Sequence, residues 1–281
     1  MFSAAIIVFR ESLEAFLIIS IMVAATRGIT QRGNWIAGGV VLGLLGSAAV
    51  AMGMERISSL ADGIGQELFN VAILLVAVAM LAWHNIWMAA HGRELALQMK
   101  STARSVAEGG SARSVILVVI ALAVLREGSE TVLFLYGVAT GSDNGLRDTV
   151  VGGSLGLLSG ALIAGLMYWG LLRIPVSRFF AVTGLLVLLL AASMASQAAR
   201  LLVQADLLPS LGAPLWDTSG VLAQTTALGT ILHGLIGYDT QPAGMQVLVY
   251  VVVLLVIASG MRWVAHRAKP GARQRETAVA R

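Results

Sequence analysis

Long apolar runs dominate the pattern of hydrophobic and polar positions along this chain. A helix of about 20 predominantly apolar residues spans the ~30 Å hydrocarbon core of a bilayer. Seven runs of that kind occur, at 2–25, 35–54, 68–90, 114–140, 148–172, 179–203 and 244–265. The pattern therefore predicts an all-α integral membrane protein with seven transmembrane helices.

Composition and charge agree with this fold class. The chain is 57% hydrophobic and 12% charged, whereas soluble domains are about 25% charged. Lys and Arg concentrate in the connections after the first, third and fifth runs and in the tail 267–281. Because basic loops stay on the cytoplasmic side, we expect an outer N-terminus and a cytoplasmic C-terminus in a bacterial inner membrane. Membrane topology thus explains the basic balance, and no nucleic-acid partner is expected.

Two charged patterns interrupt the apolar runs. Arg10-Glu11-Ser12-Leu13-Glu14 lies inside the first run, and Arg126-Glu127-Gly128-Ser129-Glu130 lies inside the fourth. Both read R-E-x-x-E. A charged residue near the centre of a bilayer costs ~2.5–3.5 kcal/mol on insertion scales, so such residues face each other or an aqueous path and are functional by default.

Two further pairs of similar segments, referred to below as echoes, accompany these two motifs. GGVVLGLLGS at 38–47 resembles GGSLGLLSGA at 152–161, and LFNVAILLV at 68–76 resembles FFAVTGLLV at 179–187. The offset is 116 residues for the motifs, then 114 and 111 for the other two echoes.

The near-constant offset predicts two three-helix repeats within a seven-helix domain at 1–266. Repeat one covers 1–90 and repeat two covers 114–203; a last helix at 244–265 and a disordered basic tail at 267–281 follow. Three crossings are an odd number, so the second repeat enters the membrane in the opposite direction. Inverted repeats are typical of transporters that bind their substrate near the midplane.

The spacing of the motif glutamates predicts a cation site. Residues three apart share a helix face, so Glu11 and Glu14 project together, as do Glu127 and Glu130. Two such faces in contact gather four carboxylates, which suit hard multivalent cations such as Mg²⁺, Ca²⁺, Mn²⁺ or ferric iron. The chain has no Cys, which excludes thiolate sites. The two motif arginines, Arg10 and Arg126, are expected to pair with the carboxylates of the empty site.

The paired R-E-x-x-E motifs resemble those of the iron permease family, which includes the yeast high-affinity and bacterial Efe-type permeases. The segment LWDTSGVLAQTTALGTILHGLIGYDTQPAG before the last run is also similar to that family. The resemblance implies import of ferric iron produced by oxidation of ferrous iron. It names Glu11, Glu14, Glu127 and Glu130 as iron ligands and implies a ferroxidase or periplasmic iron-delivery partner. Ser12 stands where the family usually has Gly, for which we expect slightly looser packing.

Three alternatives to iron import are open at this point. A permease for lead, manganese or another multivalent cation would keep the architecture. A di-iron oxidase would use Glu-x-x-His pairs, and no glutamate here has a His three residues later. A structural ion-pair network would tolerate Glu→Gln changes. We expect a transporter that is not an enzyme and holds no permanent cofactor.

Weaker candidates for a role in the cation path lie outside the two motifs. Asp62 and Glu67, in an expected outer loop, would collect cations before entry, as would the acidic residues Asp206, Asp217 and Asp239 between the last two runs. His84 lies within the third run and would bind metal or relay protons. The stretch 216–236 is expected to form a short helix on the outer surface.

Overall fold

The computed structural model describes the backbone of residues 1–27, 29–60, 66–108, 112–140, 145–170, 176–212 and 214–279. These residues form helices joined by turns, and no β-strand occurs among them. The helices are α1 Phe2–Ala25, α2 Arg32–Leu60, α3 Gln66–Ala107, α4 Ser114–Thr140, α5 Gly145–Tyr168, α6 Val176–Gln204, α7 Ala227–Ile236 and α8 Gly244–Val279. The expected all-α class is therefore confirmed for this part of the chain.

Five stretches have both the length and the apolar composition to cross a membrane. They are Arg32–Arg56, Glu67–Ala89, Leu146–Tyr168, Ala181–Gln204 and Gly244–Val264. Helices α1 and α4 have 24 and 27 residues, long enough for a span. Each carries the three charged residues of its motif in its interior, which distinguishes these two helices from the apolar five.

Two helices extend well beyond the apolar runs. α3 continues to Ala107, well past the apolar run that ends at residue 90. α8 continues to Val279, so the backbone of most of the expected disordered tail is helical. Ala, Arg, Gln and Glu make up much of that tail, and all four have high helix propensity.

The chain divides into two compact units. The first contains Met1–Asn70 and Glu94–Pro175, and the second contains Val71–Arg93 and Val176–Arg281. Each unit combines helices from both predicted repeats.

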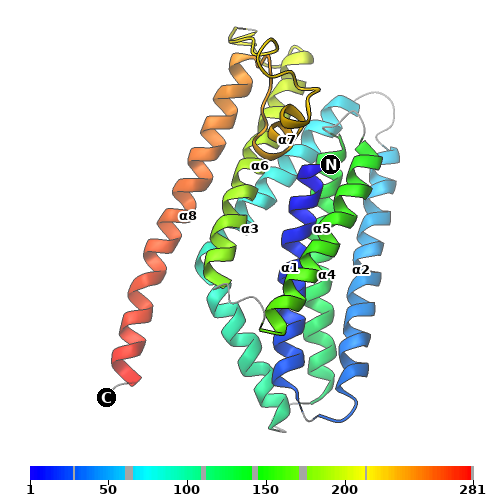
Figure 1. Cartoon of the computed structure of the whole chain (residues 1–281), viewed down its shortest axis with the longest axis vertical. Coiled ribbons are helices and arrows are strands. Elements are labelled where there is room, and N and C mark those ends of the chain that lie inside the picture. The colour runs from blue at the N-terminus through cyan, green and yellow to red at the C-terminus, as the bar shows by residue number, and fades with distance from the viewer. Residues whose placement is uncertain are drawn as a thin grey trace. The chain divides into compact units, whose positions relative to one another are not determined.

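In the first unit, the most extensive helix packing joins the two predicted repeats. α1 packs along α5, α2 packs along α4, and α1 also contacts α4 (Figure 1). Glycines allow the first two approaches: a Cβ on Gly43 would lie 2.6 Å from the Cβ of Val124, and one on Gly156 would lie 3.0 Å from that of Val8. Small residues at such spacing are the usual means by which membrane helices pack closely.

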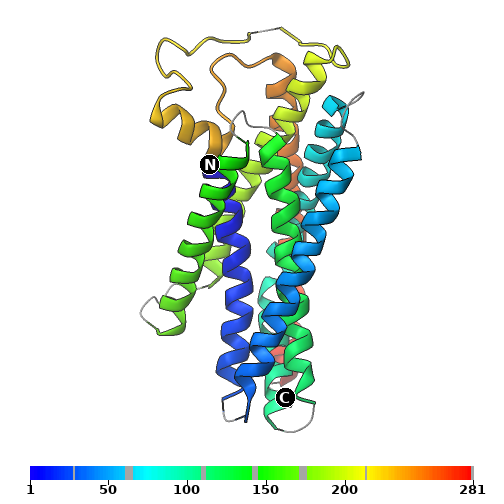
Figure 2. The same cartoon turned by 90° about the vertical axis from the view of Figure 1, so that its right-hand side faces the viewer.

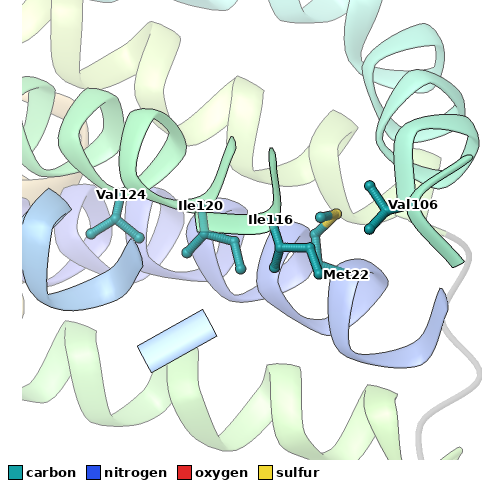
Figure 3. Packing of buried hydrophobic residues seen from close by; sticks show 5 residues of the cluster. All are labelled: Met22, Val106, Ile116, Ile120 and Val124. Atoms are coloured by element: carbon teal, nitrogen blue, oxygen red, sulfur yellow. The ribbon is translucent and has the colours of Figure 1, made fainter. Parts of the chain in front are cut away.

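An apolar cluster closes one end of this unit. The cluster consists of Met22 of α1, Val106 of α3, and Ile116, Ile120 and Val124 of α4, with Met22 beside Ile116 (Figure 3). Met22 and the two isoleucines are completely buried. Because lipid tails are as apolar as these side chains, the contacts stabilise the helix pair through van der Waals packing. These contacts fix α1 against α4 at this end, three turns away from the charged motif of α1.

The second unit is built around α6, which packs against α8 and α7. Asn85 of α3 donates a hydrogen bond from Nδ2 to the carbonyl oxygen of Gly184 (2.8 Å). Figure 2 shows α7 lying crosswise to α6 and α8. α7 is capped by Thr226, which accepts from the Gly229 amide, and ends at Gly237 in the left-handed region (φ 72°). Gly237 lies against Ser193 of α6, so this position requires both positive φ and the absence of a side chain.

Within this unit, the segment between α6 and α8 is a structured surface loop. The amide of Leu215 donates to Pro242 O and that of Thr218 to Thr240 O, so the two arms of the loop pair. The Tyr238 hydroxyl donates to Leu222 O (3.1 Å). The helix expected within 216–236 is present as α7, over the last ten residues of that stretch.

Candidate metal site

The R-E-x-x-E motif of α1 is folded into a buried ion-pair network. Arg10 Nε lies 3.1 Å from Glu14 Oε1, and Arg10 Nη1 lies 3.6 Å from Glu11 Oε1. The three side chains are 2%, 1% and 5% exposed for Arg10, Glu11 and Glu14. The pairing follows from helical spacing, because residues four apart are neighbours on one face.

The motif of α4 repeats this arrangement in a more open setting. Arg126 Nε lies 3.1 Å from Glu130 Oε1 and 3.9 Å from Glu127 Oε1. The Arg126 side chain is 39% exposed, although Glu127 and Glu130 are only 4% and 13% exposed. The two arginines therefore differ: Arg10 is fully enclosed, whereas Arg126 is partly exposed and can move more easily.

Contact between α1 and α4 brings the carboxylates of the two motifs together. Oxygens of Glu11, Glu127 and Glu130 all lie within 4.8 Å of one another, and those of Glu11 and Glu14 do so too. Two ligands on opposite sides of a cation with 2.0–2.6 Å bonds are separated by about 4–5 Å. The carboxylates of both helices are therefore within the span of a single hard cation, with Glu11 common to both sets.

The formal charge of this cluster favours a cation. Four carboxylates and two guanidinium groups sum to −2 when all are ionised. Each arginine is already paired with glutamates of its own helix. A multivalent cation would offset the remaining negative charge and provide the oxygen coordination that it prefers.

The weaker sequence candidates have different settings. Asp62 lies outside the described residues. Glu67 is exposed in the first turn of α3, where a carboxylate favourably offsets the helix dipole. His84 is buried within the α3 span. Roles for these three residues in the cation path stay predictions.

Acidic residues of the loop between α6 and α8 contribute to its structure. Asp217 accepts hydrogen bonds from the side chain and amide of Ser219 and from Gln241 Nε2. These bonds, with that of the Ser219 hydroxyl foremost, hold the pKa of Asp217 below its ordinary value of 3.8. Asp239 accepts from the Gln241 amide and lies 3.9 Å from Arg200.

The Asp217 contacts make loop stability depend on pH. A carboxylate whose pKa is lower in the folded protein stabilises that fold fully above its unfolded pKa, and the effect is lost as pH falls through the folded value. We expect the Thr218 amide to exchange hydrogen faster, after correction for intrinsic rates, as pH falls below 3.8. Hydrogen-exchange mass spectrometry of wild type and Asp217→Asn tests this; identical pH profiles for the two proteins would contradict it.

Ser47 was not a candidate in the sequence, although it lies beside the second motif. It is buried, and its Oγ donates to Gly43 O (3.0 Å), with Val124 O of α4 at 3.4 Å. A Cβ on Gly128 would lie 2.8 Å from the Ser47 Cβ. The signal that could have identified Ser47 is its place at the end of the string GGVVLGLLGS, which the second repeat echoes.

Comparison with known proteins identifies the family of this chain. Residues 1–269 match the model of the Iron permease FTR1 family. The chain belongs to the iron permease family. The protein named ferrous iron permease EfeU from Escherichia coli O6:H1 is 34% identical over 260 residues, covering 91% of this chain and 93% of that protein. The protein of that name from Yersinia pestis is 32% identical over 259 residues, covering 91% of each.

Membership of the iron permease family confirms the resemblance inferred from the two motifs. Together with the apolar helices, it makes the chain a multi-pass membrane permease for iron. These relatives are named as permeases, in agreement with a transporter and not an enzyme. No solved structure matches the chain.

Proposed function

We propose that this permease imports iron through a site formed by Glu11, Glu14, Glu127 and Glu130. The single observation that carries the proposal is the approach of buried carboxylates from α1 and α4 to within 4.8 Å. Four charges of one sign are gathered where each alone would be costly in a membrane. Transient occupancy by a multivalent cation gives that arrangement a function.

The proposed architecture has seven spans, with α1 and α4 as the charged spans beside the five apolar ones. The N-terminus lies outside and the C-terminus in the cytoplasm, as the distribution of Lys and Arg favours. Reciprocal packing supports two inverted repeats: α1 of the first repeat pairs with α5 of the second, and α4 of the second pairs with α2 of the first.

The arginines are proposed to balance the empty site and to yield to the cation. Arg126 is 39% exposed and pairs with Glu130, so it can withdraw without becoming a buried unpaired charge. Arg10, which is 2% exposed, has no such freedom. We therefore assign release of carboxylate oxygens to Arg126 and permanent charge balance to Arg10.

Ferric iron, supplied by a ferroxidase or a periplasmic delivery protein, is the proposed cargo. The relatives carry the name ferrous iron permease. That name is also compatible with a system that takes up ferrous iron and oxidises it before passage through the membrane. An all-carboxylate site favours ferric iron, because a hard, triply charged ion gains most from anionic oxygen ligands.

Dependence of iron uptake on oxygen tests the oxidation step. In cells lacking other iron importers, uptake of radioactive ferrous iron is expected to require oxygen, since oxidation precedes passage. Ferric iron supplied directly is expected to enter with or without oxygen. Cells carrying Glu14→Ala provide the background for both conditions.

Two results would contradict this proposal in different ways. Equal, glutamate-dependent uptake of ferrous iron with and without oxygen would indicate a ferrous route through the same site. Complete competition by manganese or lead at concentrations equal to iron would indicate a general multivalent-cation permease.

A further inference from the structure

Each R-E-x-x-E helix meets its partner helix at the small residue that directly follows its first glutamate. In the first motif that residue is Ser12, which lies against Gly160 of α5. A Cβ added to Gly160 would lie 3.4 Å from the Ser12 Cβ and 3.1 Å from Phe9 O. In the second motif it is Gly128, which lies against Ser47 of α2. Both crossings thus consist of one serine and one glycine, in opposite order.

The neighbouring contacts show that the two crossings are equivalent. Gly39 of α2 meets Leu117 and Ile120 of α4, as Gly152 of α5 meets Met1 and Ala4 of α1. The offset is 113 residues between the two glycines and 116 between their partners. With the same offsets, Ser47 corresponds to Gly160 and Gly128 corresponds to Ser12.

Each serine has a hydrogen-bond partner within its own helix, and Ser47 Oγ also lies within hydrogen-bond distance of Val124 O (3.4 Å) and Leu125 O (3.5 Å) of the facing helix α4. Ser12 Oγ donates to Phe9 O (3.1 Å) and Ser47 Oγ donates to Gly43 O (3.0 Å), each within its own helix. At the first crossing the contribution of the serine is therefore its volume, whereas at the second Ser47 adds its volume and hydrogen bonds to α4. A second hydroxymethyl group would crowd the crossing, because a Cβ on Gly160 would meet Ser12 Oγ and lie 3.1 Å from Phe9 O, so that Ser12 or one of the helices must shift.

We propose that these two Ser–Gly pairs are positioning residues for the cation site, which rests on the proposed function above. Each crossing accommodates one hydroxymethyl group, on either helix, and thereby sets the distance of the motif helix from its partner. Ser12 is adjacent to Glu11 and two residues from Glu14, so a shift of α1 at this crossing moves both carboxylates. Gly128 stands in the same relation to Glu127 and Glu130.

The proposal also accounts for Ser12, the one departure of the first motif from the usual glycine. Gly160 supplies the space that Ser12 occupies. The slightly looser packing expected from the sequence at Ser12 stays a prediction.

Exchange of residues across the first crossing tests this proposal. Gly160→Ser places two serines in contact and is expected to lower the rate of iron uptake about tenfold or more and to raise the KM for iron, because small displacements of positioned groups are costly. Ser12→Gly combined with Gly160→Ser recreates the order found in the second crossing and is expected to restore both values to within about twofold. Gly128→Ser, alone and with Ser47→Gly, provides the reciprocal pair of variants.

Gly165→Ser on α5 and Gly53→Ser on α2 are the matched controls. A Cβ at either position would have nothing within 4 Å, so both variants are expected to transport like wild type. Membrane levels and thermal unfolding in detergent are measured for every variant. Where Gly160→Ser does not accumulate, Gly160→Ala with and without Ser12→Gly repeats the comparison with a smaller group.

The outcomes separate this inference from the proposed function. A double exchange that transports no better than Gly160→Ser, or a Gly160→Ser protein with unchanged KM and rate, would overturn the positioning role. If Glu14→Ala in the same assay transports normally, the proposed function fails. In that case the positioning proposal fails as well, because the glutamates would not be iron ligands. Recovery of thermal stability in the double exchange would then show only that each crossing accommodates one serine.

Discussion

Replacement of either Glu14 or Glu130 by alanine is expected to abolish iron uptake while the protein still accumulates in the membrane. Each change removes one carboxylate from a site in which oxygens of α1 and α4 approach within 4.8 Å. Loss of groups that merely orient metal ligands weakens metal sites by about 10–100-fold. Loss of a direct ligand is therefore expected to reduce uptake by about 100-fold or more.

The measurement is uptake of radioactive iron at matched membrane levels. Glu108→Ala is the control, because Glu108 lies outside both motifs, is 62% exposed and pairs with Arg104 on the surface. Glu14→Gln separates charge from size, since it keeps the shape of the side chain and removes its negative charge. Normal uptake by both alanine variants would make the paired motifs a structural network and remove the basis of the proposed site.

Replacement of Arg10 by glutamine is expected to destabilise the protein far more than the same change at Arg126. Arg10 is enclosed and contacts Glu11 and Glu14, so its loss leaves buried carboxylates without their counter-charge. Removing one partner of a buried ion pair costs about 3–5 kcal/mol. The Arg126 side chain is 39% exposed, so its ion pair is less enclosed and its loss is expected to cost less.

Thermal unfolding in detergent and steady-state membrane levels measure this difference. Arg10→Lys is the control that retains the charge and loses the planar guanidinium, and it is expected to fall between wild type and Arg10→Gln. Equal destabilisation by Arg10→Gln and Arg126→Gln would show that the two motifs are equally enclosed in the membrane, and would argue against the different roles assigned to the two arginines.

Helix positions were largely predictable because each apolar run has clear polar boundaries. The expected helices at 2–25 and 114–140 correspond to α1 and α4 at both ends. The extent of α8 was not predictable from hydropathy, because its tail is helical in backbone while strongly basic in composition. Hydropathy detects only the part of a helix that lipid would cover. Helix propensity is a property of each residue and does not depend on contact with lipid.

Matching similar segments of sequence did not determine the register of the two predicted repeats correctly. Matching GGVVLGLLGS with GGSLGLLSGA aligns Gly38 with Gly152, at an offset of 114. The packing instead makes Gly39 equivalent to Gly152, because these two glycines meet corresponding residues of α4 and α1. A run of adjacent glycines leaves the alignment ambiguous by one residue, and only contact with a facing helix distinguishes them.

The sequence by itself determined that this protein is helical and built for a membrane, and that it carries two equivalent charged motifs. These properties follow from composition and from spacing along one helix, both of which are local. Tertiary structure alone decided that α1 pairs with α5 and α4 with α2, that Arg10 is enclosed while Arg126 is half-exposed, and that Ser12 meets Gly160. Each of these depends on which helix faces which, and apolar helices of similar composition do not specify a partner until small residues allow two backbones to approach.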